Sequence, residues 1–171
     1  EQGKDVLAQR LSTGELVFLA ADVPAFGSRH YRVVKDRCPL TGDCRLNGTS
    51  LENRHLRVTL DPATGNITEL VNLATGRNFA DPKVNGGLNA FRWLPANRDE
   101  PKADTDIAIA TVESGPVIVE LCVASKATGC RAVSRNVRLV AGQPWVEICN
   151  VVDKLPLVAK LSPETSDIGM L

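Results

Sequence analysis

The sequence predicts an all-β protein built as an antiparallel β-sandwich. Segments in which apolar and polar residues alternate recur about every 8–15 residues along the chain, a spacing typical of short antiparallel strands. Clusters of Gly, Pro, Asn and Asp separate these segments, and each of these residues favours a turn for its own physical reason. No stretch shows the periodicity of an amphipathic helix.

The first clear hairpin is predicted near residue 60. His55–Leu60 alternates, with its apolar residues on one face. Asp61–Asn66 has turn composition, and Ile67–Leu73 resumes the apolar pattern. Two such runs joined by a short turn predict paired antiparallel strands.

The second half of the chain repeats this pattern with many β-branched residues, which strands prefer. Arg131–Val140 alternates, and Arg135 stands among its inward-facing apolar residues. Further strands or extended segments are predicted at Glu15–Ala21, His30–Val34, Ile107–Val112, Val117–Ala124 and Trp145–Val152.

The length of 171 residues suits one domain. We expect a single β-sandwich domain over residues 1–160 and a poorly ordered polar tail over residues 161–171. The chain starts at Glu1 without a signal peptide, so it reads as a piece of a longer or processed protein. Asp81–Asp106 is rich in Pro, Gly and charge, and long loops of this kind on a rigid scaffold often carry function.

The charge balance of the chain argues against two classes of partner. Lys and Arg total 20, and Asp and Glu also total 20. This neutral balance gives no basic field for binding nucleic acid. No apolar run reaches the roughly 18 residues that a membrane helix needs, so we expect no membrane partner either.

A search for catalytic motifs yields no candidate catalytic residue. His30 and His55 are the only imidazoles, and neither has a sequence neighbour that would make it a general base. The nucleophile elbow, zincin, P-loop and dinucleotide-binding motifs are absent from the sequence. The carboxylate pairs Asp104/Asp106 and Asp99/Glu100 lie in a charged stretch, where we expect solvated charges.

Cys38 and Cys44 bracket a turn-forming stretch among five cysteines. They could close a small loop as a disulfide or remain two unrelated thiols, and a disulfide would favour a secreted, periplasmic or lysosomal-type compartment. Their spacing is too long for a zinc finger, so we expect no metal site. Cys122 and Cys149 lie in apolar runs, where we expect buried thiols.

Two other motifs have two interpretations each. Trp93, with Asn89 and Arg92 nearby, could stack on a sugar ring, or it could be buried beside Phe91. Asn47-Gly48-Thr49 and Asn66-Ile67-Thr68 match the N-glycosylation sequon, although Asn66 also suits a hairpin turn.

Four segments together resemble the β-domains of glycoside hydrolase family 38, the α-mannosidases. Pro24 to Tyr31 matches the family pattern P-x-Φ-G-x-x-x-Y, and Leu51 to Leu70 matches E-N-x-x-Φ-x-V-x-Φ-D-x-x-T-G-x-I-x-x-L. Glu113 to Val117 and Asn150 to Lys154 are similar to two later strand motifs. The order and spacing agree over about residues 15–160.

The resemblance implies a supersandwich similar to galactose mutarotase, following a catalytic barrel and a helical bundle. The zinc ligands and the nucleophile of the family belong to that preceding part, so no catalytic residue and no cofactor is carried over to this chain. The expected partners are carbohydrate and the catalytic domain. Family chains continue well beyond the strand near Asp153, so the supersandwich could be incomplete here, with an open edge.

Three functions remain open on the sequence. The first is a non-catalytic accessory domain of an α-mannosidase-like enzyme. The second is a stand-alone carbohydrate-binding module, which requires an exposed Trp93. The third is a mutarotase-like epimerase, which requires His30 and His55 to face one sheet with Glu147 or Asp153.

Overall fold

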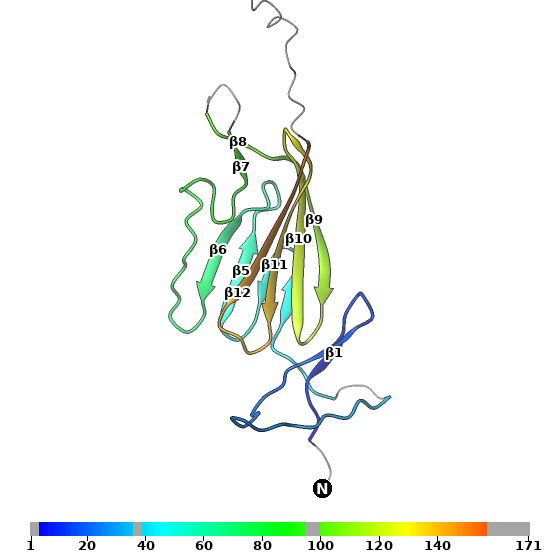
Figure 1. Ribbon diagram of the computed structural model, residues 1–171. Coiled ribbons are helices and arrows are strands. Elements are labelled where there is room, and N and C mark those ends of the chain that lie inside the picture. Colours follow the sequence, from blue (N-terminus) through cyan, green and yellow to red (C-terminus); the bar gives the residue numbers. More distant parts are fainter. Residues whose placement is uncertain (1–3, 36–38, 95–99, 157–171) are drawn as a thin grey trace, which may run out of the picture.

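The computed structural model describes residues 4–35, 39–94 and 100–156, and within these ranges the secondary structure consists of β-strands (Figure 1). The strands are β1 (Ala8–Arg10), β2 (Leu16–Phe18), β3 (Arg45–Asn47), β4 (Ser50–Glu52), β5 (Leu56–Leu60), β6 (Ile67–Asn72), β7 (Arg92–Trp93), β8 (Lys102–Ala103), β9 (Thr105–Ser114), β10 (Ile118–Lys126), β11 (Cys130–Val140) and β12 (Val146–Lys154). Among the described residues, no helix is long and apolar enough to cross a membrane.

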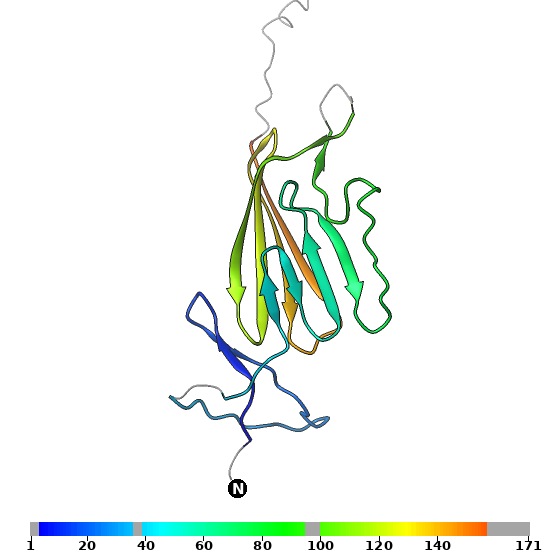
Figure 2. The ribbon, with the colours of Figure 1, turned by 180° about the vertical axis from the view of Figure 1, so that it is seen from behind.

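Two four-stranded antiparallel sheets face each other and form the body of the molecule (Figures 1 and 2). One sheet has the order β12-β11-β10-β9, and the other has the order β3-β4-β5-β6. The hairpins β1-β2 and β7-β8 are separate two-stranded units. The predicted all-β antiparallel sandwich is confirmed.

The core lies between the two sheets and is made by the period-two alternation of their strands. In β5 the apolar side chains are buried and the two residues between them are only partly buried. The antiparallel register pairs Val119 with Leu139 and Leu121 with Val137, which places all four on one face. Burial of each such side chain contributes roughly 1.5–3 kcal/mol. The largest contributors are Leu51, Val58, Leu60, Ile67, Val119, Leu121, Val123, Val137 and Leu139.

Strand β12 is an edge strand of the sheet β12-β11-β10-β9. Its register on β11 places Val146, Ile148, Asn150 and Val152 on the face that looks toward the other sheet. Ile148 is nevertheless exposed, so the opposite layer does not fully cover the inward face of this edge strand. Part of the uncovered face is contacted instead by Asn89, from the irregular stretch after β6.

The N-terminal segment lies at one end of the sandwich (Figure 1). Leu7 and Leu19 pack against the core, and polar contacts attach the segment further. Gln9 of β1 is buried, and its Oε1 accepts hydrogen bonds from the backbone N–H groups of Val117 and Ile118 at 3.0 and 2.8 Å. The Glu113 carboxylate accepts from the Ser12 N–H at 2.8 Å and from the Ser12 hydroxyl at 2.6 Å. The segment is therefore anchored where β9 turns into β10.

This anchor predicts a pH dependence that involves Glu113. Hydrogen bonding from Ser12 holds the pKa of Glu113 below its ordinary value of 4.5. The contact therefore stabilises the fold fully above that value, and the stabilisation is lost as the pH falls through the lowered pKa. We expect Ser12→Ala to raise the pKa of Glu113 in an NMR titration of the side-chain carboxyl group.

Thr13→Ala is the matched control, because the Thr13 hydroxyl donates to the exposed Glu15 rather than to Glu113. An unchanged Glu113 pKa in the Ser12→Ala variant would contradict this anchor.

Candidate functional site

The described parts of the irregular stretch, residues 81–94 and 100–104, begin along the outer side of β6 and continue at one end of the sandwich (Figure 1). Its backbone is attached to β6 by reciprocal 2.9 Å hydrogen bonds between Ile67 and Leu88. Farther along, β7 and β8 pair as a short hairpin. This end of the molecule also carries the β5–β6 and β10–β11 turns.

One buried arginine connects these segments. Arg135 of β11 is 1% exposed, because the alternation of β11 directs it between the sheets. Its Nη1 donates to the Asn66 side-chain oxygen at 2.9 Å and to the Asn89 carbonyl at 2.8 Å. Its Nη2 donates to the Thr64 carbonyl at 2.8 Å and to the Asp104 carboxylate at 3.1 Å. We call these five residues the Arg135 network.

The Arg135 network contains an ion pair that is withdrawn from water. Side-chain exposure is 2% for Arg135 and 4% for Asp104. Burial lowers the pKa of Arg135, and the Asp104 charge opposes that shift. A buried guanidinium is tolerated only when carboxylate and hydrogen-bond partners surround it. Within the described residues, its Nε and the Ser125 hydroxyl are the buried side-chain polar atoms without a hydrogen-bond partner.

The expectation that the loop carboxylates are solvated is wrong for Asp104. A buried cation 31 residues away along the chain takes it out of solvent. The expectation holds for its neighbour, since Asp106 is exposed and pairs with the exposed Lys126 at 3.0 Å. Glu100 is exposed, and Asp99 lies outside the described residues.

Two glycines allow the chain to approach this closely. Gly65 has φ +67°, and a Cβ there would lie 2.3 Å from Val123 Cγ1 and 3.0 Å from Arg135 Nη2. Gly87 has φ +113°, and a Cβ there would lie 2.4 Å from the Ile67 carbonyl oxygen. Side chains at either position would strain the backbone and displace the segment from the sandwich.

The structure places the three predicted sugar-binding residues on one short segment with different surroundings. The Asn89 amide makes a reciprocal pair with Asn150, at 3.2 and 2.7 Å. Arg92 is exposed and donates to the Asn85 carbonyl at 3.1 Å. Trp93 is half-buried, with the Lys102 ammonium 5.8 Å from its ring centroid. Sugar binding by Asn89, Arg92 and Trp93 stays a prediction.

The side chain of Asn66 is not free for modification. It is buried, and its amide oxygen accepts from Arg135 while its amide nitrogen donates to the Gly86 carbonyl at 3.3 Å. The asparagine of this sequon, Asn66, therefore has a structural role in the β5–β6 turn. Asn47 is exposed at the β3–β4 hairpin.

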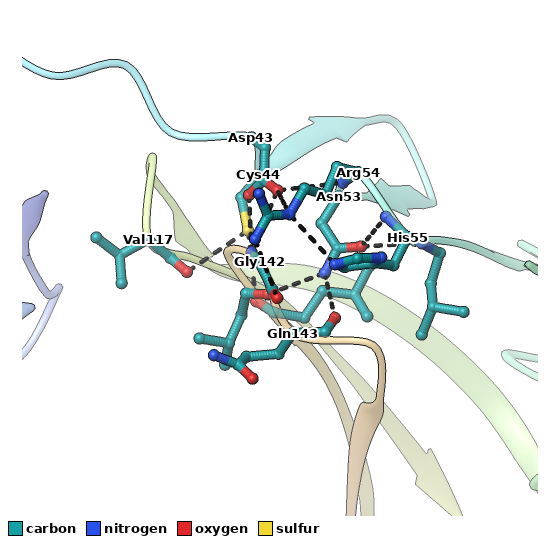
Figure 3. Close-up of polar contacts among 11 residues, drawn as sticks. Asp43, Cys44, Asn53, Arg54, His55, Val117, Gly142 and Gln143 are labelled. Carbon is teal, nitrogen blue, oxygen red and sulfur yellow. Dashed lines mark hydrogen bonds and ion pairs between the residues drawn. The ribbon is translucent and has the colours of Figure 1, made fainter. Parts of the chain in front are cut away.

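A second polar cluster (Figure 3) joins turns at the opposite end of the sandwich (Figure 1). Asn53 is 1% exposed, and its amide nitrogen donates to the carbonyls of Val140 and Gln143, both at 2.9 Å. Its side-chain oxygen accepts from the backbone N–H groups of His55 and Leu56, both at 2.9 Å.

Asp43 adds a second connection at the same place. Its carboxylate accepts from the Gly142 N–H at 3.1 Å and lies 3.5 Å from Arg54 Nε. The Arg54 Nε in turn donates to His55 Nε2 at 3.2 Å. Because these groups satisfy one another, the cluster joins the β4–β5 and β11–β12 turns as a structural clamp (Figure 3).

Comparison with protein families adds an independent observation to this geometry. The family model described as glycosyl hydrolases family 38 C-terminal domain matches residues 51–162. The chain belongs to this family. No curated protein matches the chain.

The region that matches the family 38 C-terminal domain contains the Arg135 network and most of the second polar cluster. It runs from β4 to β12 and includes the whole Arg135 network, Asn53 and the predicted sugar-binding segment. It begins after β3, so the N-terminal segment and Asp43 lie outside it. The suspected relationship to family 38 is confirmed.

The residues that an epimerase would require lie on different elements of the domain. His55 precedes β5 at the clamp, whereas His30 belongs to the N-terminal segment. The register of β12 places Glu147 and Asp153 on the outer face of the sheet β12-β11-β10-β9. There Glu147 pairs with Arg138 at 3.6 Å and Asp153 pairs with Arg131 at 2.8 Å. The structure does not bring these four residues together.

The cysteines differ in burial. Cys44 is buried, with its Sγ 3.5 Å from the Val117 carbonyl, and burial together with the Asp43 charge raises its pKa to about 12. Cys38 lies outside the described residues, so the disulfide stays a prediction. Cys122 is half-buried, and burial raises its pKa. The expectation that Cys149 is buried is wrong, because it lies on the outer face of the edge strand.

Within the described ranges no cluster of three or more His, Cys, Asp or Glu side chains is placed to hold a metal.

The thiols give a prediction about reactivity. After reduction of the protein, we expect an alkylating reagent at pH 8 to modify Cys149 well before Cys44, because the thiolate is the reactive form and Cys44 is both buried and protonated. Peptide mass mapping would locate the label, and the same map without reduction would test the Cys38–Cys44 disulfide. Equal labelling of Cys44 and Cys149 would contradict the buried position of Cys44.

The Arg135 network gives a prediction about stability. Asp104→Ala should lower the free energy of unfolding by about 3–5 kcal/mol, because it leaves a buried cation without its carboxylate. Asp106→Ala removes the carboxylate of an exposed pair and should cost no more than about 1 kcal/mol. Urea unfolding of the two variants measures the difference. Equal losses would show that the Asp104 pair is no stronger than a surface pair.

Proposed function

We propose that the chain is a non-catalytic accessory β-sandwich domain of an α-mannosidase-like glycoside hydrolase that acts in mannose metabolism. Its role is to support or extend a carbohydrate-binding cleft beside the catalytic domain. The observation that carries this proposal is the family match over residues 51–162. The cleavage of the glycosidic bond, with its zinc ion and nucleophile, is assigned to the catalytic domain, and this chain contributes contacts to the glycan.

The Arg135 network favours the stretch that contains β7 and β8 as the place of those glycan contacts. It holds the Asn89 backbone and Asp104 against the sandwich, and so it fixes both ends of the stretch that contains β7 and β8. A fixed segment loses little conformational entropy when a ligand binds to it. Trp93 and the exposed Arg92 lie on this segment.

The chemistry of these side chains suits a sugar. An indole ring offers a flat apolar face to the C–H groups of a pyranose, and its edge can donate a hydrogen bond. The Arg92 guanidinium carries several donors for hydroxyl oxygens. Because Lys102 lies over the Trp93 ring, a sugar would use the other face of the ring or displace the lysine.

A stand-alone carbohydrate-binding module is the second candidate. The partial exposure of Trp93 beside the exposed Arg92 favours it, since both side chains are accessible without a second domain. The two candidates differ in affinity. A self-sufficient module should bind an oligosaccharide by itself at micromolar concentration, whereas an accessory domain that completes a shared cleft should bind only weakly alone.

Calorimetric titration with an α-linked mannose oligosaccharide tests both candidates. We expect weak binding, with a dissociation constant near the millimolar range, and Trp93→Ala should weaken it about fivefold because an aromatic contact is worth about 1 kcal/mol. Trp145→Ala is the matched control, since Trp145 is an exposed indole at the start of β12, away from β7.

Equal effects of the two tryptophan substitutions would contradict sugar binding at Trp93, and micromolar affinity would favour the stand-alone module. Steady turnover of an aryl α-mannoside by the chain would contradict the non-catalytic role, provided that a control preparation without the chain shows no turnover.

A further inference from the structure

A cavity of about 590 Å³ lies within the N-terminal segment, outside the region that the family match covers. Its walls come from residues preceding β1, from the β1-β2 hairpin and from the extended stretch at residues 30–35. This volume lies within the roughly 300–1,000 Å³ of small-molecule sites. In both ribbon views the segment lies at one end of the two large sheets (Figures 1 and 2).

Part of the cavity wall is aromatic. The Phe18 and Tyr31 rings lie 4.8 Å apart between centroids at an angle of 53°, and both line the cavity. Both side chains are partly exposed. The face of either ring offers an apolar surface against which the ring of a ligand can pack.

Basic side chains form much of the polar part of the wall, which otherwise also carries aliphatic residues. Lys4, Arg10, Arg32 and Lys35 line the cavity, and Asp5 is the carboxylate among its lining residues, which leaves a formal charge of +3 from four cations and one anion with His neutral. A concave surface of one sign concentrates potential and attracts counter-ions.

These basic side chains differ from four arginines of the two large sheets. Arg57, Arg131, Arg135 and Arg138 each pair with a carboxylate. Among the residues that the structure describes, none of the cavity cations forms an ion pair, and the Arg10 guanidinium donates instead to the Gly14 carbonyl at 2.6 Å. Within the described part of the chain, these four cations therefore have no carboxylate at ion-pair distance.

We propose that this cavity binds a small anionic ligand with a ring, of the class of sugar phosphates, sugar sulfates or sugar acids. The cations contact the anionic group, and the ring of the ligand lies on the Phe18–Tyr31 pair. The cavity is separate from the Trp93 segment, so this ligand is distinct from the neutral glycan of the proposed function, and neither proposal depends on the other.

The composition of the chain supplies a clean reporter, because Tyr31 is its only tyrosine. Incorporation of 3-fluorotyrosine gives a single fluorine NMR signal from the cavity wall. We expect glucose 6-phosphate to shift this signal in a saturable manner, inorganic phosphate to do so more weakly, and glucose at the same concentration to leave it in place. The affinity for glucose 6-phosphate should fall as salt screens the cations.

A pair of variants makes the test specific. Arg32→Ala should weaken glucose 6-phosphate binding about fivefold, because one exposed charge contact is worth up to about 1 kcal/mol. Lys83→Ala removes an exposed lysine that does not line the cavity and should leave the affinity unchanged. Binding unaffected by Arg32→Ala, or glucose as effective as its phosphate, would overturn the proposal. Phosphate as effective as glucose 6-phosphate would overturn the ring contact.

Fluorotryptophan in the same samples reports separately on Trp93. A neutral mannose oligosaccharide that moves a tryptophan signal but not the Tyr31 signal would support the proposed function and say nothing against the cavity. Failure of one site is therefore distinguishable from failure of the other.

Discussion

The ion pair between Arg135 and Asp104 is the contact on which the end of the sandwich with the β5–β6 and β10–β11 turns depends. Period-two alternation forces Arg135 into the layer between the two sheets, among side chains that are otherwise apolar. A charge in that position is costly unless it is paired and hydrogen-bonded. The partners come from the β5–β6 turn and from the irregular stretch, so satisfying one guanidinium fixes two segments to β11. The place of Trp93 follows from this, because its segment lies between two of those partners.

Polar side chains make the other long-range connections as well. Asn53 joins two turns at the opposite end of the sandwich, and Gln9 with Glu113 attaches the N-terminal hairpin. In each case a buried side chain satisfies backbone groups that the sheets leave unpaired. The apolar core makes the two sheets pack, and these polar contacts help to determine where the remaining segments lie, together with the packing of Leu7, Leu19 and Ala80 against that core. Both proposed ligand regions, the Trp93 segment and the N-terminal cavity, lie on segments outside the two large sheets.

The alternation of the sequence predicted the main strands well, because one buried face imposes a strict period of two. The predicted runs near residues 55–60, 67–73 and 131–140 correspond to β5, β6 and β11. The β3-β4 hairpin was not predicted, since Asn47-Gly48-Thr49 was interpreted as a sequon, although Asn-Gly is also a strong hairpin-turn signal. His30–Val34 was expected to be extended and belongs to no strand. The pairing of Asp104 with Arg135 could not be predicted, because periodicity says nothing about which loop residue reaches a buried charge. Cys149 was misassigned for a related reason: its apolar run suggested burial, whereas the position of β12 at the edge of the sheet leaves it exposed.

Hydrogen exchange of the Leu88 amide in an Asp104→Asn variant tests the central claim most directly. This amide donates to the Ile67 carbonyl at 2.9 Å, next to the segment that Arg135 holds. The substitution keeps the shape of the side chain and removes its charge. If Arg135 positions the segment, the Leu88 amide should exchange much faster in the variant, while amides that pair β10 with β11 remain protected by the core. Unchanged Leu88 exchange in a folded Asp104→Asn protein would contradict the account.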